Sequence, residues 1–530
     1  MLLPTQTQPN DDAQTLESQR FRSHVGQISR QSGLFFVGTL FNAALAYGFK
    51  IYLARALGAE ALGIYALGIT LIGFLGIFNA LGLPDAAVRF VAQYQAAGQL
   101  EFLHALLWRG AGTLLVSNAV FAVLLLIGGP WVAVHFYHSA VLARYVPWFA
   151  GLMLLGVFTH FYGKVLAGYQ DINRRTLIVN FIGSPLNILI AVVLITLGFG
   201  LSGYLAAQIV SAVTVLVLLF YAVLRLTPPQ ARFSSHPGRP LQPEVVSFSY
   251  TLIGVGLMEF VMAQVDKISL GYFRGPRQVG IYSVAAAFVA YVPILLSSVN
   301  QLFSPIISGL HTLGDRAMLK RLFQALTKWI VALTLPLAIV IMVFARIVMR
   351  IFGPDFEPGW PILIVGTIGQ LVNCGVGSVG LLLLMSGHEK RLIRVQIYMA
   401  FVMLALSILL VPALGAVGAA VAAALTNIGM NLWNLLEVRR ALAIHPYNRS
   451  YLKLFPATAA ALISAFTVRH YGYVFGHNWL TVAAGLFVVY GVFGAAILAL
   501  GLDDDDNLIL RAVAIRISAA FGRGAAEGAR

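Results

Sequence analysis

Two carboxyl side chains stand inside a long apolar stretch of the sequence, residues 247–270. Glu259 and Asp266 are seven residues apart, which is two turns of an α-helix, and Gly256 and Ala263 share that helical face. A carboxyl group in an apolar environment takes up a proton more readily than one in water, so its charge can respond to conformation. We interpret both as candidate ion-coupling groups, Glu259 foremost because it lies mid-stretch. A structural pair with a basic neighbour is the competing interpretation.

Four basic side chains lie within or beside other apolar stretches: Lys50, Arg89, Lys164 and Lys267. A charged side chain within an apolar stretch is usually functional, because hydrocarbon solvates it poorly. Each of the four is therefore a candidate functional residue. Each could equally extend to the membrane surface and anchor a helix end, and Lys267 could pair with the adjacent Asp266.

Three asparagines, Asn427, Asn431 and Asn434, recur at helical spacing and form one polar stripe along the apolar stretch 416–438. Asparagine side chains commonly join membrane helices by hydrogen bonds, and they could also line a cavity. The histidines have no ligand spacing and Cys374 is the single cysteine. We therefore expect no metal site.

The composition requires a membrane to position these groups. Of 530 residues, 59% are hydrophobic and 10% charged, and the mean hydropathy is +0.84. We count fourteen apolar stretches long enough to cross a bilayer, so the chain is predicted to be an all-α multi-pass membrane protein. The connecting loops are short and contain no P-loop motif, which leaves no room for an ATPase or a catalytic domain.

The 35 basic residues outnumber the 20 acidic ones, a surplus of 15 positive charges. Placed on the fourteen-span topology, 26 basic residues fall on one side of the membrane and nine on the other. Loops rich in lysine and arginine stay in the cytoplasm, so both termini are predicted to be cytoplasmic. We therefore attribute the surplus of positive charge to the orientation of the chain in the membrane, and we expect no nucleic-acid partner.

Local patterns recur at a nearly constant offset along the chain. Gly63-Ile64-Tyr65 returns as Gly280-Ile281-Tyr282, and Gly200 and Gly415 each open a helix rich in small residues. The repeat predicts two six-helix halves, as in carriers that rock one half against the other. By residue number, we divide the chain into a polar cytoplasmic tail (1–30), a first six-helix bundle (31–225), a cytoplasmic linker (226–246), a second bundle (247–441), transmembrane helices 13 and 14 (452–501) and a cytoplasmic tail (502–530) with an interfacial helix over 507–522.

Several segments resemble the oligosaccharide flippases, the polysaccharide-transporter branch of the multidrug/oligosaccharidyl-lipid/polysaccharide exporter superfamily. They read RALGAEALGIY (55–65), LGLPDAAVRF (81–90), DKISLGYF (266–273), GIYSVA (280–285) and IFGPDF (351–356). Together they lie within residues 25–440. The resemblance implies two bundles around a central cavity, alternating access without covalent chemistry, and a location in the plasma membrane, which is the inner membrane of a two-membrane cell.

The resemblance also implies the cargo, a polyprenyl-pyrophosphate-linked oligosaccharide moved to the outer leaflet for O-antigen, capsule or exopolysaccharide synthesis. A pyrophosphate needs cations, so Lys50, Arg89, Lys164 and Lys267 are the expected ligands, with the asparagine stripe facing the sugar. No cofactor is expected beyond a coupling H⁺ or Na⁺. Expected partners are membrane lipids, a polymerase and a chain-length regulator. The alternatives are a lipid II flippase, an ion-coupled multidrug exporter, or a membrane glycosyltransferase, polymerase or ligase.

Overall fold

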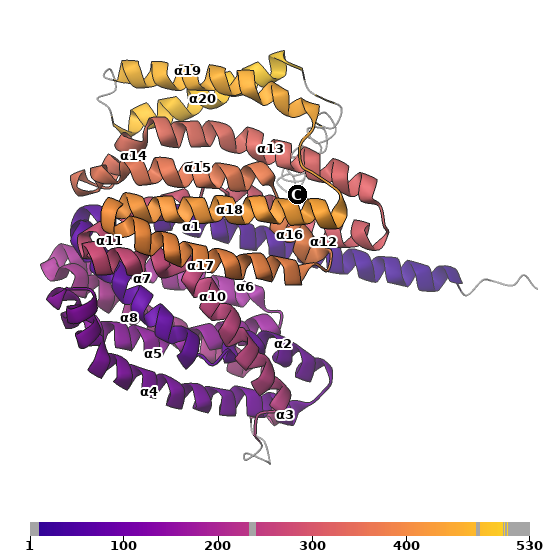
Figure 1. Ribbon diagram of the computed structural model, residues 1–530. Helices are drawn as coiled ribbons and strands as arrows, with labels where there is room; N and C mark the ends of the chain where they lie inside the picture. Colours follow the sequence, from indigo (N-terminus) through magenta and orange to yellow (C-terminus); the bar gives the residue numbers. More distant parts are fainter. Residues whose placement is uncertain (1–9, 233–239, 473–477, 502, 504–505, 507–530) are drawn as a thin grey trace, which may run out of the picture. The chain divides into compact units, whose positions relative to one another are not determined.

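The computed structural model describes residues 10–232, 240–472 and 478–501, with Asp503 and Asp506, and gives side chains from Leu45 onward except at Leu302 and Pro305. Within these ranges every regular element is a helix (Figure 1), and no strand is present. The predicted interfacial helix at 507–522 and the first nine residues of the polar tail lie outside the described residues. Residues 10–30 of that tail are helical and run into the first apolar stretch.

Eleven helical ranges are long and apolar enough to cross a membrane, or twelve if one bent pair counts as a span. Two of the long ranges are interrupted by a glycine with a non-helical backbone conformation. Leu45–Asn79 has 35 residues and Ile172–Leu226 has 55, whereas about 20 residues span a bilayer. The first range contains Gly58 and the second Gly198, both with backbone angles that no α-helix adopts. The protein is a multi-pass membrane protein, and its exact span count and orientation stay predictions.

One predicted span is broken in the structure. The stretch 280–302 divides into α11 (Pro276–Val289) and α12 (Ile294–Thr312), with a bend of 48° between α11 and residues 294–301. Pro293 precedes α12 at the break. Because proline has no amide hydrogen and restricts the residue before it, a helix that reaches this point ends or bends.

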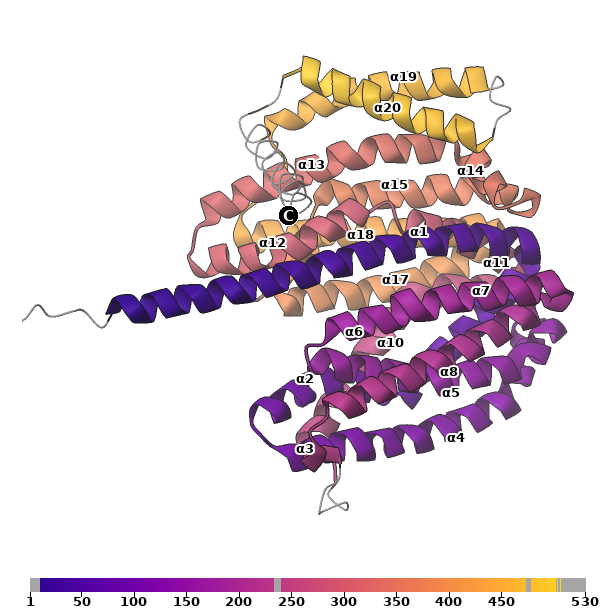
Figure 2. The same cartoon turned by 180° about the vertical axis from the view of Figure 1, so that it is seen from behind.

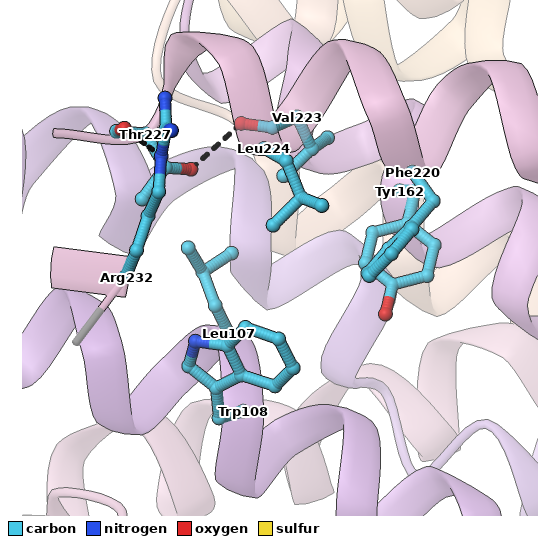
Figure 3. Close-up of a pocket in the computed structure, with 8 residues that line it drawn as sticks. All are labelled: Leu107, Trp108, Tyr162, Phe220, Val223, Leu224, Thr227 and Arg232. Atoms are coloured by element: carbon cyan, nitrogen blue, oxygen red, sulfur yellow. Dashed lines mark hydrogen bonds between the residues drawn. The ribbon is translucent and has the colours of Figure 1, made fainter. Parts of the chain in front are cut away.

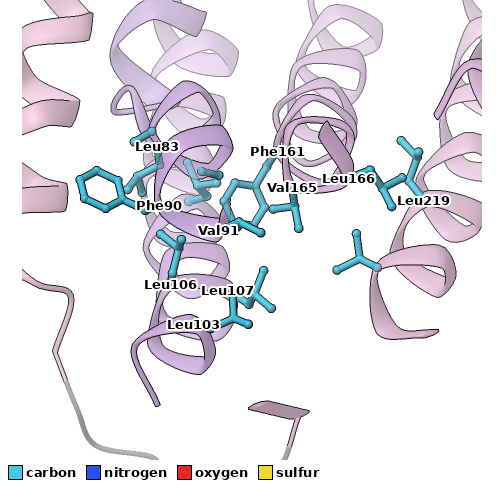
Figure 4. Close-up of a cluster of buried hydrophobic side chains, with 14 of the residues drawn as sticks. Leu83, Phe90, Val91, Leu103, Leu106, Leu107, Phe161, Val165, Leu166 and Leu219 are labelled. Carbon is cyan, nitrogen blue, oxygen red and sulfur yellow. The ribbon is translucent and has the colours of Figure 1, made fainter. Parts of the chain in front are cut away.

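The chain forms two compact units. Unit 1 comprises Met1–Ala56, Leu71–Val132 and Ala140–Leu257. Its helices are α1 as far as residue 56 (α1 is Asn10–Asn79), α2 (Leu83–Ala96), α3 (Leu100–His104), α4 (Gly110–Trp131), α5 (Ala140–Gly168), α6 (Ile172–Thr176), α7 (Ser184–Leu194), α8 (Gly200–Leu226), α9 (Pro229–Arg232) and the start of α10 (Pro243–Arg274). Buried side chains of α2, α5 and α8 form its core (Figure 4), among them Phe90, Phe161, Val165 and Leu219.

Unit 2 comprises Leu57–Thr70, Ala133–Ser139 and Met258–Arg530. Besides α11 and α12 it contains α13 (Arg316–Val343), α14 (Ala345–Ile351), α15 (Trp360–Val376), α16 (Val379–Met385), α17 (Glu389–Leu414), α18 (Ala416–Leu442), α19 (Leu454–His470) and α20 (Trp479–Ala499). A core cluster joins α12, α13, α16 and α18 through residues such as Phe303, Phe323, Leu382 and Val438. The α19–α20 hairpin packs beside α13 (Figure 2).

Matched backbone angles support the internal repeat. Gly58 has φ 78° and ψ 175°, and Gly275, its counterpart in the second repeat, has φ 78° and ψ 177°. Gly200 and Gly415, the other matched pair, have φ 54° and 58° with ψ −132° and −134°. These conformations are costly for any residue with a Cβ atom, so glycine is required at both copies of each turn.

Candidate functional site

A charged pair inside unit 1 joins α2 and α5. The Lys164 ammonium lies 2.6 Å from Asp85 Oδ1, and His160 Nε2 lies 3.9 Å from the same oxygen. The Asp85 side chain is 50% exposed and that of Lys164 is 30% exposed. Gly168 lets the two helices approach, since a Cβ atom there would lie 2.8 Å from Val91 Cβ.

Arg89 lies one helical turn beyond Asp85 on α2. Its guanidinium carbon is 4.9 Å from the Phe248 ring centroid and 5.4 Å from that of Phe90. Such cation–π contacts orient the guanidinium plane, and its N–H groups point outward from the rim of that plane. We call Asp85, Arg89, His160 and Lys164 the α2–α5 cluster.

The α2–α5 cluster has the chemistry of an anion site. Lysine supplies a compact charge to phosphate and arginine a fork of donors. Asp85 holds Lys164 by an exposed ion pair, which is weak in water and can be exchanged for a doubly charged ligand. Arg175 adds a further positive charge beside α5, with its Nε 3.4 Å from the Cβ position of Gly163.

Sequence reasoning selected Arg89 and Lys164 but missed Asp85 and His160. The missed signal was their helical spacing. Asp85 precedes Arg89 by four residues, and His160 precedes Lys164 by four, so each pair occupies one helix face.

The other two predicted cations have different surroundings. Lys50 is half-buried on α1 of unit 1. In unit 2, the Lys267 ammonium donates to Gln264 Oε1 at 2.8 Å and to the Ala263 carbonyl at 3.0 Å. The expected mutual pairing of the Asp266 and Lys267 side chains is wrong in detail, because the lysine is bound by its own helix.

Asp266 is buried and satisfied by other donors. Its Oδ1 accepts from the Lys267 backbone amide at 2.7 Å, and its Oδ2 accepts from the Tyr282 hydroxyl. By contrast, Glu259 on the same helix is exposed and has no ion-pair partner among the residues that the structure describes. The expected alternative of a structural pair at Glu259 is therefore unsupported there, and ion coupling stays a proposal.

The asparagine stripe of α18 bonds mainly to protein. Asn427 donates to the Gly369 carbonyl of α15 at 3.3 Å, and Asn431 donates to the Asn427 side-chain oxygen at 2.8 Å. Asn431 and Asn434 are buried. The bond from Asn427 to α15 fits the helix-joining interpretation of the stripe, whereas the buried Asn434 Oδ1 has no hydrogen-bond partner among the described residues.

A small surface pocket in unit 1 lies where the helical turn Ala105–Arg109, α5, α8 and α9 meet (Figure 3). It is lined by Leu107, Trp108, Tyr162, Phe220, Val223, Leu224, Thr227 and Arg232. Arg232 Nε donates to the Thr227 carbonyl at 2.8 Å, and its terminal nitrogen donates to the Arg225 carbonyl. Because the arginine is bound to backbone and the other walls are mostly apolar, the pocket is better suited to a hydrocarbon group than to a phosphate.

A buried network in unit 2 was not foreseen from the sequence. The Lys328 ammonium of α13 lies 2.8 Å from Asp503 Oδ2 and 2.7 Å from Asp506 Oδ2, and Trp329 Nε1 donates to Asp506 Oδ1. Lys453, just before α19, binds Asp503 Oδ1 at 2.6 Å. The Lys328 and Asp506 side chains are 10% and 6% exposed. We call these five residues the Lys328 network; it ties the chain that flanks α19 and α20 to α13.

Comparisons with known proteins agree with this architecture. Residues 28–311, more than half of the chain, match the family described as "Polysaccharide biosynthesis protein". The succinoglycan biosynthesis transport protein ExoT of Rhizobium meliloti is 27% identical over 59% of this chain and 60% of its own length, which is under two thirds of that relative. The "Probable flippase AglR" of Haloferax volcanii is 25% identical over 39% of this chain and 44% of its own.

Solved structures share the fold at low identity. The lipid II flippase MurJ, in an inward closed conformation, aligns with a TM-score of 0.67 at 14% identity and covers 87% of this chain and 98% of its own. An inward-facing multidrug resistance MATE family transporter of the MOP superfamily aligns with a TM-score of 0.63 at 18% identity and covers 77% and 94%. The family match over residues 28–311 shows that the chain belongs to the polysaccharide biosynthesis protein family.

Proposed function

We propose that this protein is a plasma-membrane flippase that moves a polyprenyl-pyrophosphate-linked oligosaccharide to the outer leaflet by alternating access, without altering it covalently. Membership of the polysaccharide biosynthesis protein family supports the class of cargo. The names of the two relatives, a succinoglycan transport protein and a probable flippase, point the same way.

The observation that carries the proposal is the part-exposed α2–α5 cluster. Lys164, Asp85 and Arg89 are charged, yet α5, the helix of Lys164, is long and apolar enough to cross a membrane. Charged side chains in such a helix face a water-filled path rather than lipid. A path with surplus positive charge attracts the pyrophosphate of the carrier lipid, while the polyprenyl chain stays in the bilayer.

In this mechanism the protein binds, releases and changes shape. Lys164 exchanges Asp85 for a pyrophosphate oxygen, and Arg89 offers its guanidinium fork from the next turn of α2. Rocking of one repeat against the other then exposes the bound group to the opposite side. Glu259 is our candidate for the group whose protonation or Na⁺ binding supplies the energy. A polymerase and a chain-length regulator are the proposed partners that receive the cargo.

The test is leaflet transfer in reconstituted vesicles. The full-length protein is placed in liposomes with a fluorescent polyprenyl-pyrophosphate oligosaccharide, and a membrane-impermeant quencher reports its leaflet. We expect transfer of a chemically intact lipid, and slower transfer with Lys164→Gln. Arg440→Gln is the matched control, since Arg440 is exposed and its partner Glu437 keeps Arg391.

The same vesicles separate the competing functions. Transfer of lipid II in preference to the oligosaccharide lipid would identify a peptidoglycan flippase. Ion-driven efflux of an organic cation without lipid transfer would identify a drug exporter, and a lengthened or cleaved sugar would identify an enzyme. Any of these three results contradicts the proposal.

A further inference from the structure

The two sequence repeats meet at a reciprocal glycine contact within unit 2. A Cβ atom on Gly63 would overlap the Pro276 carbonyl oxygen and lie 3.0 Å from the Gly280 amide nitrogen. A Cβ atom on Gly280 would overlap the Ala59 carbonyl oxygen and lie 2.9 Å from the Gly63 amide nitrogen. The offset from Ala59 to Pro276 equals the offset from Gly63 to Gly280. The same contact is therefore made twice with the roles of the repeats exchanged.

One face of segment 57–70 makes all these contacts. Ala59 and Gly63 touch α11, and Leu67 lies against the Cβ position of Gly271 on α10. Thr70 contacts Gln264 of α10, with 3.3 Å between the hydroxyl and Gln264 Oε1. Spacings of three and four residues place these four residues on a single helical stripe. We call the contact of this stripe with α10 and α11 the seam.

A chain of hydrogen bonds leads from the seam to Lys267. Gln264 Oε1 accepts from the Lys267 ammonium at 2.8 Å and contacts the Thr70 hydroxyl at 3.3 Å. The ammonium thus fixes the direction in which the amide oxygen points. Thr70 has a second acceptor, the Ala66 carbonyl at 2.9 Å. Since a hydroxyl has one proton, Thr70 can give up Gln264 and stay hydrogen-bonded within its own helix.

We propose that Gln264 is a positioning residue that couples anion binding at Lys267 to opening of the seam on the extracytoplasmic side. An anion that draws the ammonium away leaves the Gln264 amide free to rotate, and the seam loses its polar contact. The stripe then keeps its apolar packing at Gly63, Gly280 and Leu67 but lacks this polar contact, and rocking of the repeats can separate it. The side follows from the predicted orientation, in which the Gly58 and Gly275 turns face outward.

This coupling rests on the proposed transport of an anionic lipid, but its test needs no transport. Hydrogen–deuterium exchange of the full-length protein in detergent is measured for peptides that cover 57–70, with and without inorganic pyrophosphate. Release of one hydrogen bond should speed exchange about fivefold in the wild type. Thr70→Val should show faster exchange before any anion is added. The Lys267→Gln variant should not respond to pyrophosphate, and Lys267→Arg should recover the response.

Two results would overturn the coupling: exchange in 57–70 that pyrophosphate leaves unchanged, or an equal response in Lys267→Gln. Arg440→Gln serves as the matched control, because Arg440 is exposed on α18 and lies outside both the seam and the α2–α5 cluster, so its loss should leave the seam response intact. Thermal midpoints verify that each variant is folded. If the seam responds while vesicles show no lipid transfer, the proposed function fails and the coupling does not.

Discussion

Two lysine–aspartate clusters in this protein have nearly the same distances and opposite surroundings. In the α2–α5 cluster, Lys164 lies 2.6 Å from an Asp85 that is half exposed. In the Lys328 network, Lys328 lies 2.7 Å from an Asp506 that is almost wholly buried. Distance alone would assign both pairs the same role. Exposure separates them, because water screens one charge pair and protein encloses the other.

This difference in exposure indicates which of the two pairs is structural. An exposed ion pair contributes about 0–1 kcal/mol to stability, so Asp85 and Lys164 can part at little cost. Breaking a buried pair leaves an uncompensated charge in a medium of low polarity. The Lys328 network therefore holds α19 and α20 in place, and the α2–α5 cluster is free to exchange partners with a ligand.

The largest effect on stability is expected in the buried Lys328 network. Lys328→Met leaves Asp503 and Asp506 without their shared cation and should lower the free energy of unfolding by about 3–5 kcal/mol. Thermal unfolding in detergent measures this loss. Adding Asp503→Asn and Asp506→Asn to the same variant should recover part of it. A midpoint equal to that of the wild type would show that the network is not structural.

In the exposed α2–α5 cluster, Lys164→Gln should have a small effect on stability and a large effect on ligand binding. We expect stability to change by less than about 1 kcal/mol, whereas affinity for inorganic pyrophosphate should fall about 10- to 100-fold because a charge-assisted hydrogen bond is lost. Titration calorimetry measures the affinity. Asp85→Asn removes the internal competitor and should tighten binding. Weaker binding in Asp85→Asn would contradict the idea that Asp85 and the ligand share Lys164.

A smaller effect on stability is expected when the pH is lowered, and it should come from Asp503 of the Lys328 network. Burial opposes ionisation of Asp503, but hydrogen bonds from Lys328, Lys453 and Ser450 outweigh it and hold the pKa of this carboxyl well below its usual range. A lowered pKa gives stability that is complete above the unfolded pKa of about 3.9 and is lost as pH falls through the folded value. The thermal midpoint should therefore fall on this account only below about pH 4. A matching loss near neutral pH that Lys328→Met abolishes would contradict this assignment.

The smallest effect on stability is expected at Glu259. Exposed and without an ion-pair partner among the described residues, its change to Gln should alter the free energy of unfolding by no more than about 0.5 kcal/mol. If Glu259 is the coupling group, the same variant should lose the dependence of transport on the H⁺ or Na⁺ gradient. If transport by the Glu259→Gln variant still depends on the ion gradient, Glu259 is not the coupling group.

Much of the fold follows from hydrophobicity and glycine. Apolar stretches predicted an all-α membrane protein, and the repeat offset aligns Gly58 with Gly275, whose backbone angles agree in the structure. The prediction of one continuous helix over 280–302 was wrong, because the structure divides this stretch into α11 and α12. Hydropathy averages over a window and cannot register the break before Pro293.

The site was harder to predict because partners distant in the chain decide each role. Lys328 and Asp506 are 178 residues apart, and no local pattern indicates that they meet. The Asp503–Asp506 run looked like the acidic start of a helix, which is the local interpretation of such a run. At Lys164, sequence identified the cation, whereas its exposed bond to Asp85 emerged only from the packing of α2 on α5.

We propose that the part-exposed α2–α5 cluster carries a pyrophosphate-linked oligosaccharide lipid across the membrane. The most direct test is the rate of leaflet transfer of that intact lipid, measured side by side for wild type, Lys164→Gln and Arg440→Gln in vesicles of equal protein content. We predict rapid transfer by the wild type and Arg440→Gln, with transfer reduced about tenfold or more by Lys164→Gln. Equal rates for all three proteins, or no transfer by the wild type, would contradict the account.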